Sequence, residues 1–297
     1  MSGMQGKSKK TLFIVSLILI LALGIVGYDQ LRYDLEDDLE TGAALLNQNE
    51  YQKAIIHYEA VLAKGVKDHR VYDGLATAHH KTSDFTAAEE YWAKALELAP
   101  TNSQLYTDIG FAYYHQGKSS LAEKQFEKAL VLDPEDPNAQ RGLGWIYLDN
   151  GNLDGALTQF LSSRDTNPSF FRTYVGLGRV YGRLGNYSSA QNAFEEAIEL
   201  KPENIEDDRP YLGLAFAHLY QKNYSAAMEW ANIAQEEWDG YSVHNIKGLI
   251  HLASGDDLKA NDEFEKATQI DPKKAKTERV AWIDELKTAG LFEKSID

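Results

Sequence analysis

The sequence predicts an all-α solenoid of about seven helix-turn-helix repeats with a C-terminal capping helix, preceded by one transmembrane helix. Two observations predict this fold. Prolines recur every 34 residues, at Pro100, Pro134, Pro168 and Pro202. A repeat of this length indicates small helical units that must stack to bury their apolar faces. In addition, residues 11–28 form an uncharged apolar run, and no other segment is as apolar.

Each repeat unit is expected to hold two short amphipathic helices of roughly 12–15 residues, with apolar side chains at i, i+3, i+4 and i+7. Gly110 in a first helix and Ala122 in the second helix of the same unit are small, so the two backbones approach closely. Phe126 is bulky and covers the junction to the next unit, and the proline ends the second helix because it cannot continue an α-helix. The alanine of the second helix recurs at Ala54, Ala88, Ala122, Ala156, Ala190, Ala227 and Ala260.

The N-terminal segment is expected to cross a membrane. Residues 1–10 form a basic cytoplasmic tail and residues 11–28 a transmembrane helix, which at ~1.5 Å per residue extends about 27 Å, close to the thickness of a hydrocarbon core. Lysines precede the run and only Arg32 closely follows it. The positive-inside rule therefore predicts a single-pass protein with a cytoplasmic N-terminus and its repeats on the far side, periplasmic or extracellular in a bacterium. The alternative is a cleaved signal peptide, although the apolar run continues past the small residues Ala22 and Gly24.

Seven repeat units are predicted after a short linker at residues 29–34. The fifth unit carries extra residues in an acidic turn, and the sixth has Ala231 in place of the bulky aromatic residue. The predicted units cover residues 35–68, 69–102, 103–136, 137–170, 171–207, 208–240 and 241–274.

Residues 275–297 are predicted to form a capping helix and a tail. On this helix Val280, Ile283 and Leu286 are expected to line one side, with Glu278 and Glu285 on the outside. Gly290 is placed to end the helix.

The order of residue types within a unit resembles the tetratricopeptide repeat, whose pattern is an aromatic residue, Leu-Gly, Tyr, Ala, Phe, Ala and Pro. One unit that meets it has Tyr174, Leu177, Gly178, Tyr181, Ala190, Phe194, Ala197 and Pro202. The resemblance covers about 240 residues. It implies a right-handed superhelix whose concave surface, lined by the first helices, binds other proteins. It does not imply a particular partner. The groove positions where some family members bind chaperone tails with lysine and asparagine hold Asp73, Thr77, Thr107 and Phe111 instead, so a receptor for such tails is not expected.

Composition and motifs argue against several other classes of protein. The net charge of −15 disfavours nucleic-acid binding, and the absence of cysteine excludes disulfides and thiolate metal sites. No catalytic or phosphate-binding motif is present, so the sequence predicts no enzyme, no catalytic residues and no cofactor. The adjacent His79 and His80 lack further metal ligands nearby, so no metal site is predicted.

The candidate binding residues lie at positions of the first helices that are expected to face the groove. Arginines in an acidic protein attract carboxylates and can bind them bidentately. Aromatic residues supply the anchors found at binding hot spots. The alternative is that several aromatic side chains, Trp145 and Phe111 first among them, pack between units. The predicted partner-binding groove comprises His80, Phe111, Tyr114, Arg141, Trp145, Arg172, Arg179, Arg183, Phe216 and Tyr220.

These observations predict a non-catalytic, membrane-anchored scaffold or adaptor for a membrane or envelope complex. Its partner would be a protein or peptide segment with an acidic group or a C-terminus. One alternative is a glycan-binding envelope protein that uses Tyr114, Trp145 and Tyr220 as stacking platforms. Another is a scaffold that assembles with itself through Ala231, Trp238 or the terminal helix. No oligomeric state is predicted.

Overall fold

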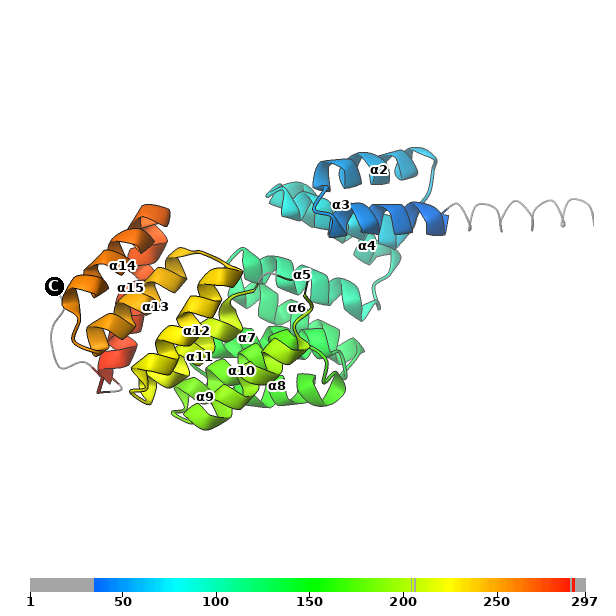
Figure 1. The fold of residues 1–297 in the computed structure, drawn as a ribbon. Helices are drawn as coiled ribbons and strands as arrows, with labels where there is room; N and C mark the ends of the chain where they lie inside the picture. The colour runs from blue at the N-terminus through cyan, green and yellow to red at the C-terminus, as the bar shows by residue number, and fades with distance from the viewer. Residues whose placement is uncertain (1–34, 204, 206, 289, 292–297) are drawn as a thin grey trace, which may run out of the picture. The chain divides into compact units, whose positions relative to one another are not determined.

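The computed structural model describes residues 35–203, 205, 207–288 and 290–291, and the regular elements of this part of the chain are α-helices (Figure 1). The chain divides into two compact units, Met1–Ala112 and Tyr113–Asp297. The boundary falls inside α5 (Ser103–His115). The apolar run at residues 11–28, with its flanking tail and linker, lies outside the described residues. Within them, none of the helices combines the length and the apolar character needed to cross a bilayer.

The first unit consists of paired helices. A helix runs through residues 35–47, followed by α2 (Tyr51–Ala63), α3 (His69–Lys81), α4 (Phe85–Leu98) and most of α5. The Tyr58 ring lies between two glycines on neighbouring helices, since a Cβ added at Gly42 or Gly74 would come within 2.2 or 2.3 Å of it. Burial, with a smaller effect of the nearby Asp73 carboxylate, raises the pKa of Tyr58 to about 12. The phenol therefore belongs to the core of this unit.

The second unit continues the pattern of helix pairs. Its elements after α5 are α6 (Ser119–Leu132), α7 (Pro137–Asp149), α8 (Leu153–Thr166), α9 (Phe171–Arg183), α10 (Tyr187–Leu200), α11 (Arg209–Tyr220), α12 (Tyr224–Glu237), α13 (Tyr241–Ala253), α14 (Asp257–Ile270) and α15 (Pro272–Thr288). Consecutive pairs are joined by short turns, and the prediction of an all-α helical-repeat protein is confirmed.

One phenylalanine of each regular second helix holds successive pairs together. The Phe160 ring on α8 lies between Gly144 of its own pair and Gly176 of the next pair, so that a Cβ at these glycines would lie 2.8 and 2.4 Å from it. Phe194 on α10 fills the same space against Gly178 and Gly213. The first helices carry glycine at these positions because the ring rests directly on their backbones.

The turn inside each pair has its own local chemistry. Gly151 and Gly185 adopt φ values of 76°, a left-handed conformation that glycine reaches without steric cost. The next residue caps the second helix: the Asn152 side chain accepts a 3.0 Å hydrogen bond from the Gly155 backbone, and Asn186 accepts one of 3.2 Å from Ser189. These signals fix where the helices begin, independently of their neighbours.

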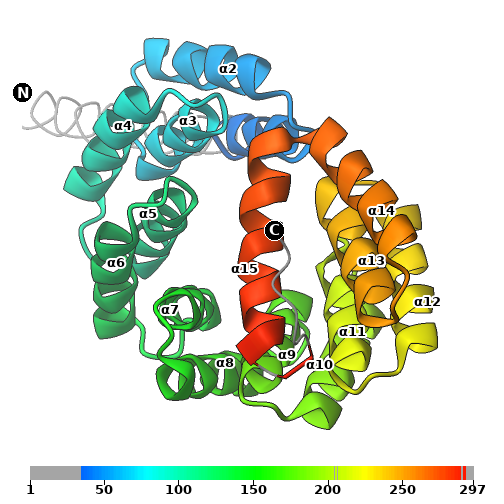
Figure 2. The same ribbon diagram turned by 90° about the vertical axis from the view of Figure 1, so that its left-hand side faces the viewer.

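The helix α15 departs from the predicted orientation. In Figure 2 it lies on the inner side of α13 and α14. Ile283 and Leu286 are buried as predicted, but Val280 is 50% exposed, and Glu278 is half-buried instead of lying outside. The prediction for those two side chains is wrong because Ala275, not Val280, completes the face that packs on the preceding helices.

Candidate functional site

A cavity of about 460 Å³ lies within the second unit, between α15 on one side and α9, α10 and α11 on the other. Its walls combine aromatic rings with charged groups of both signs. The charged residues that line it are Arg179, Arg183, Asp208, Arg209, Glu278 and Glu285. The cavity is therefore a mixed polar and aromatic site on the inner side of the helix pairs.

The helix α9 supplies the central arginines. Val175 and Val180 are completely buried on one side of it. Arg172, Arg179 and Arg183 follow one another at spacings of seven and four residues, which places them on the other side of the same helix. All three side chains reach solvent. The amphipathic pattern of α9 thus forces its cations toward the inner surface.

Arg179 is exposed to solvent and also contacts a buried aromatic ring. Its guanidinium lies over the Trp145 ring, 5.4 Å from the ring centroid, and it lines the cavity. Burial and the neighbouring charge of Arg183 lower the pKa of Arg179, but a guanidinium stays charged at neutral pH. Arg183 donates a 2.7 Å hydrogen bond to the Leu148 carbonyl. In the part of the chain that the structure describes, neither arginine forms an ion pair with a carboxylate.

The other arginines of this region form polar contacts with neighbouring side chains. Asp207 receives a 2.7 Å hydrogen bond from Arg209 Nε, and Arg172 Nε lies 4.0 Å from the same carboxylate. Although burial acts to raise it, the contact with Arg209 lowers the pKa of Asp207. Arg141 donates a 2.7 Å hydrogen bond to Asn138, and burial lowers the pKa of Arg141 to about 10. The positive charge open to a ligand is therefore concentrated at Arg179 and Arg183.

Aromatic side chains form the rest of the wall. Phe216 on α11 packs edge-on against Trp282 on α15, with ring centroids 4.6 Å apart. Tyr220 stacks on Tyr187 at 4.9 Å. Burial, and after it the Glu285 carboxylate, raise the pKa of Tyr220, so this phenol is neutral. Phe216 and Trp282 thus join α11 to α15, whereas Tyr187 and Tyr220 join α10 to α11.

The predicted groove residues are divided between the two units. His80 and Phe111 belong to the first unit, and the other eight belong to the second. His80 packs 5.5 Å from Phe85 and 5.9 Å from Trp92, and burial lowers its pKa. Trp145 is only 6% exposed and packs edge-on to Phe160. Trp145 therefore forms the floor under Arg179, as the packing alternative expects.

Tyr114 donates a 2.7 Å hydrogen bond to Asp149. Four other predicted residues line the cavity. These are Arg179, Arg183, Phe216 and Tyr220. The predicted groove lacks Arg209, whose place at the start of a first helix was an available signal. It also lacks Glu278, Trp282 and Glu285 of α15. Their helical spacing is visible in the sequence, but nothing local indicates which surface they face.

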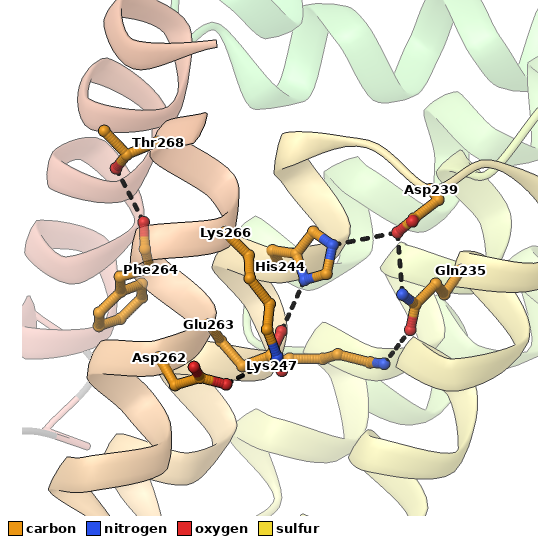
Figure 3. A network of polar contacts seen from close by, with 9 residues as sticks. All are labelled: Gln235, Asp239, His244, Lys247, Asp262, Glu263, Phe264, Lys266 and Thr268. Carbon is orange, nitrogen blue, oxygen red and sulfur yellow. Dashed lines mark hydrogen bonds and ion pairs between the residues drawn. The ribbon is translucent and has the colours of Figure 1, made fainter. Parts of the chain in front are cut away.

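A second polar cluster lies away from the cavity, where α12, α13 and α14 meet (Figure 3). The His244 ring is 7% exposed and lies between two carboxylates, with Nδ1 2.6 Å from Glu263 and Nε2 3.0 Å from Asp239. Lys266 pairs with Glu263 at 2.9 Å, and Lys247 contacts Gln235. Because its groups are paired among themselves, this cluster ties the helices together. Across the described ranges, no group of three or more histidine, aspartate or glutamate side chains is arranged to hold a metal ion.

Comparisons with known proteins support the helical-repeat architecture. The family described as "Tetratricopeptide repeat" matches residues 39–103, 107–169 and 171–204. No curated protein sequence shows significant similarity to this chain. The family matches together cover more than half of the sequence.

Solved structures resemble the chain at low sequence identity. The APC/C hetero-tetramer Cut9–Hcn1 superposes with a TM-score of 0.72 at 19% identity, covering 84% of this chain and 48% of that one, so this chain spans about half the length of its counterpart. A tetratricopeptide repeat protein from Parabacteroides merdae gives a TM-score of 0.63 at 19% identity and coverages of 86% and 98%. PilW, a type IV pilus biogenesis factor, gives a TM-score of 0.58 at 18% identity and covers 67% of this chain and 91% of its own. At these identities the likeness shows the fold alone, and together with the family matches it establishes that the chain belongs to the tetratricopeptide-repeat family.

Proposed function

We propose that this protein is a non-catalytic scaffold that binds an acidic segment of a partner protein at the cavity of its second unit. The observation that carries the proposal is the pair Arg179 and Arg183, which line a solvent-open cavity without a carboxylate partner among the described residues. The α9 wall of the cavity is therefore cationic in a chain of net charge −15, and such a wall attracts carboxylates. The partner would dock an aromatic or aliphatic side chain against Phe216 and Tyr220 while its acidic group or C-terminus meets the arginines.

The test reverses the charge of both arginines in the full-length chain. The variant Arg179→Glu/Arg183→Glu is expected to capture at least about ten-fold less partner, because charge-assisted hydrogen bonds at an interface contribute several kcal/mol. Capture is measured by crosslinking in the native membranes, followed by identification of the crosslinked segment, which should be rich in aspartate and glutamate.

The matched control is Arg164→Glu, since Arg164 lies on α8, away from the cavity, and pairs with its neighbour Asp165 at 2.7 Å. Circular dichroism should show the same helicity for all variants. Equal capture by the double variant and the wild type would reject the arginine site.

We further propose that residues 11–28 anchor the chain in a membrane with the N-terminus in the cytoplasm. The support is the length and uncharged character of this run. Because the chain has no cysteine, a single introduced cysteine reports its own side of the membrane. A membrane-impermeant maleimide applied to intact cells should label Ser254→Cys, which lies in an exposed turn, but not Ser2→Cys. Labelling of Ser2→Cys alone, or release of the chain by alkaline carbonate, would contradict the anchor.

The two alternative functions lose part of their basis. Trp145 is 6% exposed and cannot act as a stacking platform for a sugar. Ala231 is fully buried, so it cannot form a surface for self-assembly, although Trp238 remains 58% exposed. Neither alternative has a set of open groups comparable to the arginine-lined cavity.

A further inference from the structure

The helix α15 has two different faces. One face anchors it to the preceding pair: Ala275, Ile283 and Leu286 are buried, and the Arg279 guanidinium lies 4.7 Å from the Phe264 ring centroid. The other face carries Glu278, Trp282 and Glu285 at positions i, i+4 and i+7, and all three line the cavity. The buried residues that anchor α15 are therefore different from Trp282 and Glu285, which it presents to the cavity.

Polar contacts strengthen the anchor near the start of α15. Glu278 accepts hydrogen bonds from Ser242 Oγ at 2.9 Å and from Asn245 Nδ2 at 3.1 Å. Asn245 also donates to the Ala275 carbonyl at 3.0 Å. Trp282 and Glu285 lie beyond these contacts, and they face the opposite wall through Phe216 and Tyr220.

The two walls are complementary, and they touch where Phe216 packs against Trp282. The wall formed by α9 and α11 presents Arg179 beside Phe216 and Tyr220, and α15 presents an aromatic residue flanked by two acids. The cavity of about 460 Å³ remains between them. The Trp282 ring covers Phe216, and Glu285 lies beside the Tyr220 hydroxyl, so a ligand that needs both aromatic side chains competes with α15.

We infer that Trp282 and Glu285 are an intramolecular stand-in for the partner. The partner is then an amphipathic helix that carries an acidic residue, an aromatic residue four positions later and a second acidic residue three positions after that. Such a helix reaches Arg179, Phe216 and Tyr220 only by displacing Trp282 and Glu285. The affinity of the protein for its partner is therefore held down by its own C-terminal helix. This inference rests on the proposed function.

The experiment uses a fluorescent synthetic peptide with the sequence of residues 273–288, which reproduces the face of α15. Its dissociation constant is measured by fluorescence anisotropy against the full-length chain in detergent. The variant Trp282→Ala/Glu285→Gln should bind it about ten-fold or more tightly than the wild type, because the competing side chains are gone. A peptide with the same two changes should not bind. Adding Arg179→Glu to Trp282→Ala/Glu285→Gln, which we call the opened variant, should abolish binding of the peptide.

The matched control is Val280→Ala, which changes α15 at a half-exposed position outside the cavity lining and should bind the peptide as the wild type does. If the double variant loses helicity by circular dichroism, the single variant Glu285→Gln replaces it. Equal affinity of the wild type and the opened variant, or no binding to either, would overturn the inference. A different result would separate the two proposals. If Trp282→Ala/Glu285→Gln binds the peptide through Arg179, but partner capture in membranes is the same for Arg179→Glu/Arg183→Glu and the wild type, the stand-in exists and the proposed function fails.

Discussion

At the scale of single residues, His244 shows how this chain stabilises buried charge. Both ring nitrogens face carboxylates, those of Asp239 and Glu263, within 3.0 Å. Burial acts to raise the pKa of Glu263, but hydrogen bonds from His244 and Lys266 outweigh it, and the net pKa is lowered. Helical periodicity does not predict these contacts, because Glu263 lies on the helix that follows the one carrying His244.

Replacing His244 by alanine is expected to lower the free energy of unfolding by about 2–3 kcal/mol at pH 7, because Glu263 loses a buried donor and a cavity forms. A carboxylate whose folded pKa is depressed stabilises the fold above its unfolded pKa, about 4.3, and that contribution is lost as the pH falls through the folded value. Urea unfolding from pH 7 down to pH 3 should therefore show a shallower loss of stability for the variant than for the wild type.

The control for this prediction is Lys259→Ala, which removes the exposed pair of Lys259 with Asp256 and should change stability by less than about 0.5–1 kcal/mol. A variant His244→Ala as stable as Lys259→Ala would show that the buried cluster contributes nothing.

At the scale of the elements, each helix pair is joined to the next by a ring that rests on two backbones. The glycines of the same pair, such as Gly144, are predictable from the repeat pattern. The glycine of the following pair, Gly176, meets the same Phe160 ring from the other side. This second contact exists only because successive pairs stack, so no spacing within one unit indicates it.

Phe160→Ala is expected to cost about 3–5 kcal/mol of unfolding free energy, because the ring is completely buried and its loss leaves a cavity between two pairs. Gly176→Ala should also destabilise the unit, since its Cβ would lie 2.4 Å from that ring. Unfolding in urea followed by circular dichroism measures both effects. Leu258→Ala, at a position 85% exposed on α14, serves as the control and should stay within about 0.5 kcal/mol of the wild type. A Phe160→Ala variant within that range would contradict the role of the ring.

At the scale of the molecule, the helix pairs follow from local physics that the order of residues carries. Proline ends helices, glycine allows the left-handed turn at Gly151 and Gly185, and asparagine caps the helix that follows. Each of these acts over a few residues, so the period of 34 and the all-α class are readable without a structure. The same amphipathic pattern indicates that Arg172, Arg179 and Arg183 share one side of α9.

The surface of α15 that faces these arginines cannot be predicted from the sequence in this way. Glu278, Trp282 and Glu285 meet Arg179, Phe216 and Tyr220 although they lie far from them in sequence. Periodicity tells which side chains share a face of a helix, but not which other face it meets, because that depends on how α15 packs against α13 and α14. The arrangement of the cavity therefore came from packing between distant elements, whereas the helices and their turns came from interactions between neighbours in the chain.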